Sequence, residues 1–250
     1  KSKFIQAATL VLSIATGLLP TAMAAEQPAT TPFPTKQKPW KREALTNECA
    51  ALEKSVRSFM ALPAEQVRPH PAAADFPGVP PAEATPVTRK LSLDTRIPRW
   101  HSTGLYAVPG QAITVTVPAN ASSARLAVRI GCHKDQLWNP KIKSWSRAPE
   151  VTRSFPLKNV ETRAANAFGG PVYIEVPQDC ALGVIEVTVS GAVAAPLFEL
   201  GKSDLAAWRN EIRNAPGPWA ELAGKKLVIS LPSENVRQLD DPAAVVEFWD

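Results

Sequence analysis

The chain has 250 residues, 45% of them apolar, which is enough material for one large domain or two small ones around a hydrophobic core. This composition excludes a chain that is disordered throughout. The formal net charge of +5 falls to about +3 if Lys1 and Lys3 are removed, too weak and too evenly spread for a nucleic-acid-binding protein.

The first 24 residues have the layout of a secretory signal peptide. Lys1 and Lys3 supply a positive start, residues 7–19 form an apolar run, and Ala22-Met23-Ala24 fits the small-x-small cleavage pattern. The alternative is an uncleaved membrane anchor, but a span needs about 20 apolar residues, and this run is shorter and contains polar residues. We therefore expect cleavage after Ala24, no stable membrane span afterwards, and export from a bacterial cell to the periplasm, the cell surface or the medium.

The next 74 residues, 25–98, are rich in proline except for one stretch. Residues 25–40 indicate a disordered tether. Residues 41–62 predict an amphipathic helix, because apolar residues recur there at spacings of four, three, four and three. These residues are Leu45, Cys49, Leu52, Val56 and Phe59. Prolines return in residues 63–98, which we expect to run extended along the surface of the following domain.

Residues 99–201 contain several short segments in which apolar and polar β-branched residues alternate, each bounded by Gly, Pro or Asn. The segments are 113–117, 126–130, 172–176, 184–189 and the shorter 197–200. This pattern is typical of antiparallel strands with one face on a core and one in water. It predicts a mostly β fold with a β-sandwich at 99–201.

After Gly201 the apolar period changes to that of a helix. Ser203 is the expected N-cap of a helix that ends before Pro216. A strand is expected at 226–231, and Asp241-Pro242 predicts the start of a second helix. That helix carries Phe248 and Trp249, which we expect either to be exposed or to fold back imperfectly onto the helix at 203–214. Its abrupt end at Asp250 leads us to interpret the sequence as a fragment.

In an oxidising compartment, the three cysteines are candidates for a disulfide bridge. Cys132 follows one predicted strand, and Cys180 lies in a turn between two later ones. A bridge between them would close a loop of 47 residues and stabilise the fold by about 4 kcal/mol. Cys49 is then left over. The alternative is that all three are small buried hydrophobic residues.

No complete catalytic or metal-binding motif is present in the sequence. His70, His101 and His133 do not have the spacing of a metallopeptidase site, and the adjacent Cys132 lacks further ligands at the spacings that zinc requires. Trp138 and Trp145, in the insertion at 134–149, are candidate glycan contacts because flat aromatic rings stack on sugars. The alternative is that they close the open end of the sandwich as apolar plugs.

Several short blocks, in order, resemble one family. They are Trp100-His-Ser-Thr-Gly-Leu-Tyr-Ala107, Pro109-Gly110, Ile130-Gly-Cys-His133, Trp145 with Arg147-Ala-Pro149, Asn166 with Phe168-Gly-Gly170, Val172-Tyr-Ile-Glu-Val-Pro177, Ser190-Gly-Ala192, Trp208-Arg209 and Pro218-Trp219-Ala-Glu-Leu222. Together they are similar to the enhancin-like zinc metallopeptidases, which include mucin-degrading proteases of bacteria. The resemblance runs from about Phe76 to Asp250.

In that family a β-sandwich precedes a catalytic domain in which two histidines of a His-Glu-x-x-His helix hold zinc and the glutamate is the general base. The resemblance implies that residues 202–250 begin an α+β catalytic domain and that zinc belongs to the intact protein. It transfers no catalytic or metal-binding residue to this chain, which we expect to be inactive alone. The predicted function is the N-terminal part of a secreted zinc metallopeptidase acting on glycoproteins such as mucins. The alternative is a non-enzymatic module that binds glycans or a surface.

Overall fold

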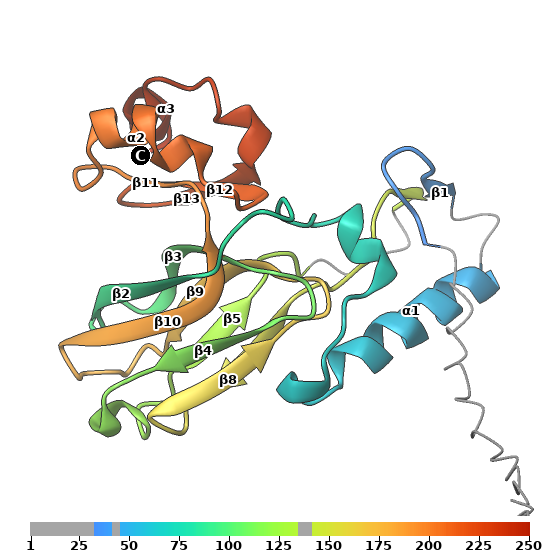
Figure 1. The fold of residues 1–250 in the computed structure, drawn as a ribbon, viewed down its shortest axis with the longest axis horizontal. Helices are drawn as coiled ribbons and strands as arrows, with labels where there is room; N and C mark the ends of the chain where they lie inside the picture. The colour runs from blue at the N-terminus through green and yellow to red at the C-terminus, as the bar shows by residue number, and fades with distance from the viewer. Residues whose placement is uncertain (1–32, 42–45, 135–141) are drawn as a thin grey trace, which may run out of the picture. The chain divides into compact units, whose positions relative to one another are not determined.

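The computed structural model describes residues 33–41, 46–134 and 142–250 (Figure 1). The predicted signal peptide with its cleavage site at Ala24 lies outside these residues, as does Trp138. In the part of the chain that is described, none of the helices combines the length and the apolar character needed to cross a membrane. Antiparallel strands dominate, so the predicted mostly β fold class is confirmed.

The centre of the fold is an antiparallel sandwich of two layers. The first layer has the order β2, β10, β4, β8, and the second has the order β3, β9, β5, β7. The strands of the first layer are β2 (Val87–Asp94), β10 (Val184–Ala194), β4 (Ala112–Thr116) and β8 (Glu161–Ala165). The strands of the second are β3 (Arg99–Ala107), β9 (Gly170–Val176), β5 (Ala127–Ile130) and β7 (Arg153–Pro156).

Strand β10 belongs to both layers. Its first part pairs with β2 and β4, whereas its last two residues pair with β3. The change occurs at a register shift between Ser190 and Ala192, where Gly191 has a φ of +87° that favours glycine. Because a bulge bends and twists a strand, β10 can leave one layer and join the other, and the sheet is nearly closed.

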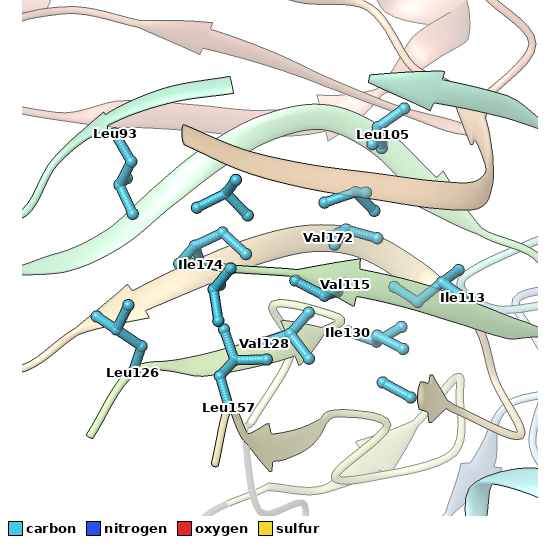
Figure 2. Close-up of a cluster of buried hydrophobic side chains, with 14 of the residues drawn as sticks. Leu93, Leu105, Ile113, Val115, Leu126, Val128, Ile130, Leu157, Val172 and Ile174 are labelled. Atoms are coloured by element: carbon cyan, nitrogen blue, oxygen red, sulfur yellow. The ribbon is translucent and has the colours of Figure 1, made fainter. Parts of the chain in front are cut away.

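The core lies between the two layers and follows from the alternation in the strands. In β4, Ile113 and Val115 are buried while the threonines beside them are only partly covered. Figure 2 shows these two side chains pointing toward Val128 and Ile130 of β5. Each large apolar side chain that is fully buried contributes about 1.5–3 kcal/mol, so this cluster is the main source of the stability of the sandwich.

The predicted helix of the front segment is present as α1 (Thr46–Met60). Leu52 and Val56 are buried against Phe168, which follows β8, so the helix packs on the sandwich through the predicted apolar stripe. The end of the predicted tether is not free, because β1 (Trp40–Lys41) pairs with β6 (Ser144–Trp145).

The segment 63–98 was expected to be extended on the surface, and this expectation is wrong for its last third. Two short 3₁₀ helices, η2 (Ala64–Gln66) and η3 (Pro71–Ala74), are followed by β2, which pairs with β10 along its whole length. Leu93 of β2 belongs to the sandwich core. The sandwich therefore begins at Val87 and not at Arg99, because the alternation Val-Thr-Arg-Lys-Leu-Ser-Leu builds a strand despite the prolines around it. A further 3₁₀ turn, η4 (Ala119–Ala121), follows β4.

The last 54 residues, 197–250, form a separate small layer with its own core. Its strands are β11 (Leu197–Glu199), β12 (Trp219–Ala223) and β13 (Val228–Pro232), and its helices are α2 (Leu205–Asn210), η5 (Ile212–Asn214), η6 (Ser233–Asn235) and α3 (Pro242–Trp249). Strand β11 pairs parallel with β12, so the expectation that 197–200 is a strand of the sandwich is wrong. The cap of α2 is Asp204 and not Ser203, whose hydroxyl accepts from the backbone N–H of Glu199 instead.

Helix α3 begins as predicted. The Asp241 carboxylate accepts from the backbone N–H groups of Ala243 and Ala244, and Pro242 occupies the first helical turn. Phe248 and Trp249 are 81% and 59% exposed, so the prediction that they lie on the surface is confirmed.

Candidate functional site

A buried polar cluster joins the sandwich to the C-terminal layer. In β9, Val172 and Ile174 point into the sandwich core, so Tyr173 points out of the opposite face of the sheet. In β12, Ala220 and Leu222 belong to the core of the C-terminal layer, so Glu221 points away from that core. The two side chains meet: the Tyr173 hydroxyl donates to Glu221 Oε1 over 2.7 Å.

Both members of this pair are almost completely shielded from water. Tyr173 is 3% exposed and Glu221 is 5% exposed. Burial raises the pKa of Glu221 to about 7, although hydrogen bonds from Tyr173 and from Ser102 act in the opposite direction. Burial, followed by the nearby Glu221 carboxylate, also raises the pKa of the Tyr173 phenol. Glu221 can thus hold a proton near neutral pH, but no substrate can reach it, and its contacts are those of a docking site.

Cys132 lies at the edge of this cluster. Its Sγ is 3.7 Å from Ser230 Oγ on β13 and 3.4 Å from Nδ1 of the adjacent His133. Burial raises the pKa of the thiol above its ordinary value, although hydrogen bonds with Ser230 and Tyr173 act in the opposite direction. The side chain is therefore held in the thiol form and is a poor nucleophile.

The predicted bridge between Cys132 and Cys180 is not formed, since both are free thiols. The physical reason is the antiparallel register, in which Ile130 of β5 lies opposite Val172 at the start of β9. Cys132 is therefore near one end of β9, whereas Cys180 follows its other end. A strand of this length spans about 20 Å at about 3.3 Å per residue, far beyond the Cα separation of about 7 Å that a disulfide allows. Cys180 packs against the sandwich core, and Cys49 is also a free thiol.

Aromatic rings surround the cluster on the side of the front segment. The ring centroid of His133 lies 4.7 Å from those of both Trp219 and Phe76. Trp219 Nε1 donates to the carbonyl of Pro77 over 2.8 Å. These contacts connect the segment before the sandwich to β12, so three distant parts of the sequence converge on one junction.

Close backbone contact completes the junction. The Gly217 N–H donates to the Ala194 carbonyl over 2.8 Å, and a Cβ at position 217 would lie only 2.6 Å from Ala195 Cβ. The Ser233 hydroxyl donates to the Gly217 carbonyl over 2.6 Å. Only glycine fits at position 217 without movement of its neighbours.

The other two histidines have structural contacts, and His101 Nε2 lies 2.7 Å from the carbonyl oxygen of Ile97. His70 Nδ1 accepts from the N–H of Ala72 at the start of η3, and its ring stacks on Phe168 at 4.6 Å. Burial lowers the pKa of His70 to about 4, so it is neutral at physiological pH. Across residues 33–41, 46–134 and 142–250, no group of three or more His, Cys, Asp or Glu side chains could hold a metal ion. These residues offer no donor set for zinc, and we assign them no step of zinc chemistry.

Of the two tryptophans expected to contact glycans, Trp138 lies outside the described residues and Trp145 does not provide a site. Trp145 is 5% exposed in β6, opposite Trp40. Its burial leaves no ring face for a sugar, which corrects the predicted glycan contact. Tyr173 and Glu221 were not predicted as functional residues. In the sequence, Glu221 could have been noticed because it is an acidic residue between apolar residues of a short segment with strand-like alternation.

The block Asn166 to Gly170 has a structural role. The Asn166 side-chain amide donates to the carbonyls of Ile130, Val151 and Gly169, at 3.0, 3.1 and 3.2 Å. Its Oδ1 accepts from the N–H of Phe168. Asn166 is fully buried, so one side chain supplies hydrogen-bond donors to three carbonyls in the interior.

Two family descriptions match consecutive parts of the chain. Residues 82–190 match the N-terminal domain of M60-like peptidases, and residues 191–250 match peptidase M60, enhancin and enhancin-like. The two matches meet in the middle of β10, at its bulge. Tyr173 therefore belongs to the first match and Glu221 to the second, and the buried hydrogen bond connects the two.

Curated relatives include mammalian proteins. The chain is 37% identical over 185 residues to the TRPM8 channel-associated factor 3 of Mus musculus, a match that covers 74% of this chain and 19% of that protein. It is 40% identical over 151 residues to the TRPM8 channel-associated factor 2 of Homo sapiens, which covers 60% and 16%. The chain thus spans less than a fifth of the length of these relatives.

Solved structures with a similar fold include a metallopeptidase. The IMPa metallopeptidase from Pseudomonas aeruginosa superposes with a TM-score of 0.52 at 19% identity, over 68% of this chain and 20% of that one. A protein of unknown function from Bacillus anthracis superposes with a TM-score of 0.51 at 20% identity, over 66% and 35%. At these identities the likeness concerns the fold.

Proposed function

Because this chain belongs to the enhancin-like, or M60, peptidase family, we propose that it forms the N-terminal sandwich and the first part of the catalytic domain of a zinc metallopeptidase. What supports the peptidase is the match of residues 191–250 to the peptidase M60 description, directly after the N-terminal domain of that family. The zinc ligands and the general base would come from another part of the intact protein, since the sequence contains no His-Glu-x-x-His motif.

The observation that carries this proposal is the buried junction. Tyr173 and Glu221 join the two matched regions through a hydrogen bond of 2.7 Å that is closed to water. Gly217 adds a backbone contact to the end of β10. Such a junction holds the small C-terminal layer in a fixed position on the sandwich. The role of this chain is then to position the catalytic domain, because chemistry requires the reacting groups to be held within fractions of an ångström.

The proposed substrates are glycoproteins, mucins among them, and the proposed location is outside the bacterial cytoplasm. The family resemblance supports the substrate class, and the pattern of residues 1–24 supports export.

The test begins with the gene. The DNA beyond the codon for Asp250 is read, and a longer product with an in-frame His-Glu-x-x-His motif is expressed. We expect it to cleave a mucin-type glycoprotein, and we expect a chelator or a Glu→Gln change in the motif to abolish cleavage. The 250-residue chain is the matched control and should cleave nothing. A longer product that contains the motif but cleaves no glycoprotein would overturn the proposal, as would chelator-sensitive cleavage by the 250-residue chain.

A second candidate is a module that binds a surface or a partner without catalysis. The observation in its favour is that mammalian relatives at 37% and 40% identity are named as channel-associated factors. This reading predicts a longer product without the His-Glu-x-x-His motif that binds its target and leaves the target intact on a gel.

A further inference from the structure

The outer face of the second sandwich layer carries an ordered row of side chains. Trp100 of β3 lies opposite Glu175 of β9, which lies opposite Ala127 of β5. In the next row Arg129 lies opposite Tyr173. These residues alternate with the buried core residues of the same strands, so they project from the other side of the sheet.

Two open cavities lie on this face. One of about 680 Å³ is lined by Arg99, Trp100, Arg125, Ala127, Glu175, Val176 and Pro177. The other, of about 460 Å³, lies beside α1 and has Arg129, Lys134, Glu150 and Ser154 in its wall. Trp100 is 38% exposed in the first cavity, where Ala127 and Pro177 extend its apolar surface.

Positive and negative side chains around Trp100 are not fully paired. The Arg129 guanidinium lies 4.4 Å from the centroid of the Trp100 ring and forms an ion pair with Glu175 at 2.5 Å. Glu175 also accepts from the Ser154 hydroxyl, and Arg125 forms an exposed ion pair with Asp179. Among the described residues, the ion pairs leave two cations of this face without an acidic partner. They are Arg99 and Lys134, and the Lys134 Nζ lies 5.2 Å from the centroid of the Trp100 ring.

The backbone gives an independent observation. Within the ranges that the structure describes, three residues other than glycine have positive φ: Arg99 at +84°, Arg125 at +57° and Glu150 at +50°. All three line the two cavities of this face. Such conformations are costly for side chains with a Cβ and cluster at functional sites. A glycine at position 99 would adopt the same backbone conformation without strain. The backbone therefore does not explain why this residue is an arginine.

We propose that this face binds an acidic oligosaccharide, with a sugar ring against the exposed part of Trp100 and the acidic group on the Arg99 guanidinium. Arginine suits this task because its planar fork donates two parallel hydrogen bonds to a carboxylate or a sulfate. A sugar is favoured over a nucleic acid because the unpaired cations number two and flank a single aromatic ring, which is too little for a phosphate backbone. The inference rests on the proposed action on glycoproteins and adds a second contact for the same substrates.

The test measures binding and not cleavage, so its failure is separate from failure of the peptidase proposal. The 250-residue chain is titrated with 3′-sialyllactose, with 3′-sulfated lactose and with lactose as the neutral match. We expect at least one acidic sugar to bind more tightly than lactose. The two acidic probes show whether the group that Arg99 holds is a carboxylate or a sulfate.

The decisive variant is Arg99→Gly, because it removes the guanidinium and also relieves the positive φ. We expect the Tm to stay equal or rise while the affinity for the acidic sugar falls by about ten- to a hundredfold, the range for a lost hydrogen bond to a charged group. Arg163→Gln, at an exposed position of β8 in the other layer, is the matched control and should bind like the wild type.

Four results would overturn the proposal. They are binding of neither acidic sugar, equal binding of lactose, unchanged affinity in Arg99→Gly, and an equal loss in Arg163→Gln. A poly-glutamate peptide that binds in place of both sugars would also overturn it, because the face would then hold an acidic peptide.

Discussion

The substitution Glu221→Gln tests the junction most directly, because it removes one ionisation and keeps the shape of the side chain. In the unfolded chain a glutamate titrates with a pKa of 4.5, whereas in the folded protein burial raises the pKa of Glu221 to about 7. Below pH 4.5 the carboxyl is protonated in both states. As the pH rises toward 7, the unfolded state loses its proton first, so the folded state loses stability, and the loss is complete above pH 7.

The difference between a pKa of 4.5 and one of about 7 corresponds to about 3 kcal/mol. Glu221→Gln should therefore match the wild type at pH 4 and exceed its free energy of unfolding by about 3 kcal/mol at pH 8. Urea is the suitable denaturant because it leaves the ionic strength unchanged. Unfolding midpoints and slopes would be measured between pH 4 and pH 8.

Two tyrosine variants sharpen this experiment. Tyr173→Phe removes a hydrogen bond that lowers the pKa of Glu221, so its cost should grow as the pH rises through 7. Tyr106→Phe removes the bond of another buried tyrosine, from the Tyr106 hydroxyl to the Gly78 carbonyl, and its cost should not vary between pH 4 and pH 8. The reasoning is refuted if Glu221→Gln and the wild type give parallel profiles, or if the variant is the less stable protein at pH 8.

The remaining predictions concern the packing at Gly217, the hydrogen bonds of buried carbonyls and the oxidation state of two cysteines. Gly217→Ala should lower the free energy of unfolding by about 1–3 kcal/mol, because its Cβ would meet Ala195 at 2.6 Å; a calorimetric Tm equal to that of the wild type would contradict this. Asn166→Ala should cost about 3 kcal/mol or more, because buried carbonyls lose their donor; urea unfolding measures this, and a cost under about 1 kcal/mol would show that water replaces the amide. Alkylation in denaturant without a reductant should label Cys132 and Cys180, and mass spectrometry that finds them unlabelled and linked would restore the bridge.

The strands that the sequence predicts are those in which β-branched residues alternate with polar ones. Val115 and its neighbours in β4 are an example, and this segment forms a strand within one residue of the predicted bounds. Strands β7 and β8 were not predicted, because Arg-Ser-Phe-Pro and Glu-Thr-Arg-Ala-Ala contain few residues with strand propensity. Their pairing with β5 and β4 forms them, and pairing is a tertiary property that a single segment does not display.

The junction could not be predicted for a similar reason. Glu221 and Tyr173 are 48 positions apart, and nothing local distinguishes a buried glutamate with a donor from an exposed one. The cysteine bridge failed because spacing along the sequence says nothing about which end of a strand each cysteine follows. Phe248 and Trp249 are exposed as predicted, although Val245, three and four residues before them on the helix, packs partly against the core of the C-terminal layer.

The bulge in β10 has a consequence for building chimaeras from this family. A crossover placed where the two family matches meet, between Ser190 and Gly191, would split one hydrogen-bonded strand and give each parent half of its ladder. The donor and recipient halves of the strand would have to agree in bend and register before either layer could close. A crossover at Pro196, between β10 and β11, leaves β10 whole and keeps β11 with its partner β12. Recombinants joined there should yield soluble protein from parents that fail when joined at residue 190.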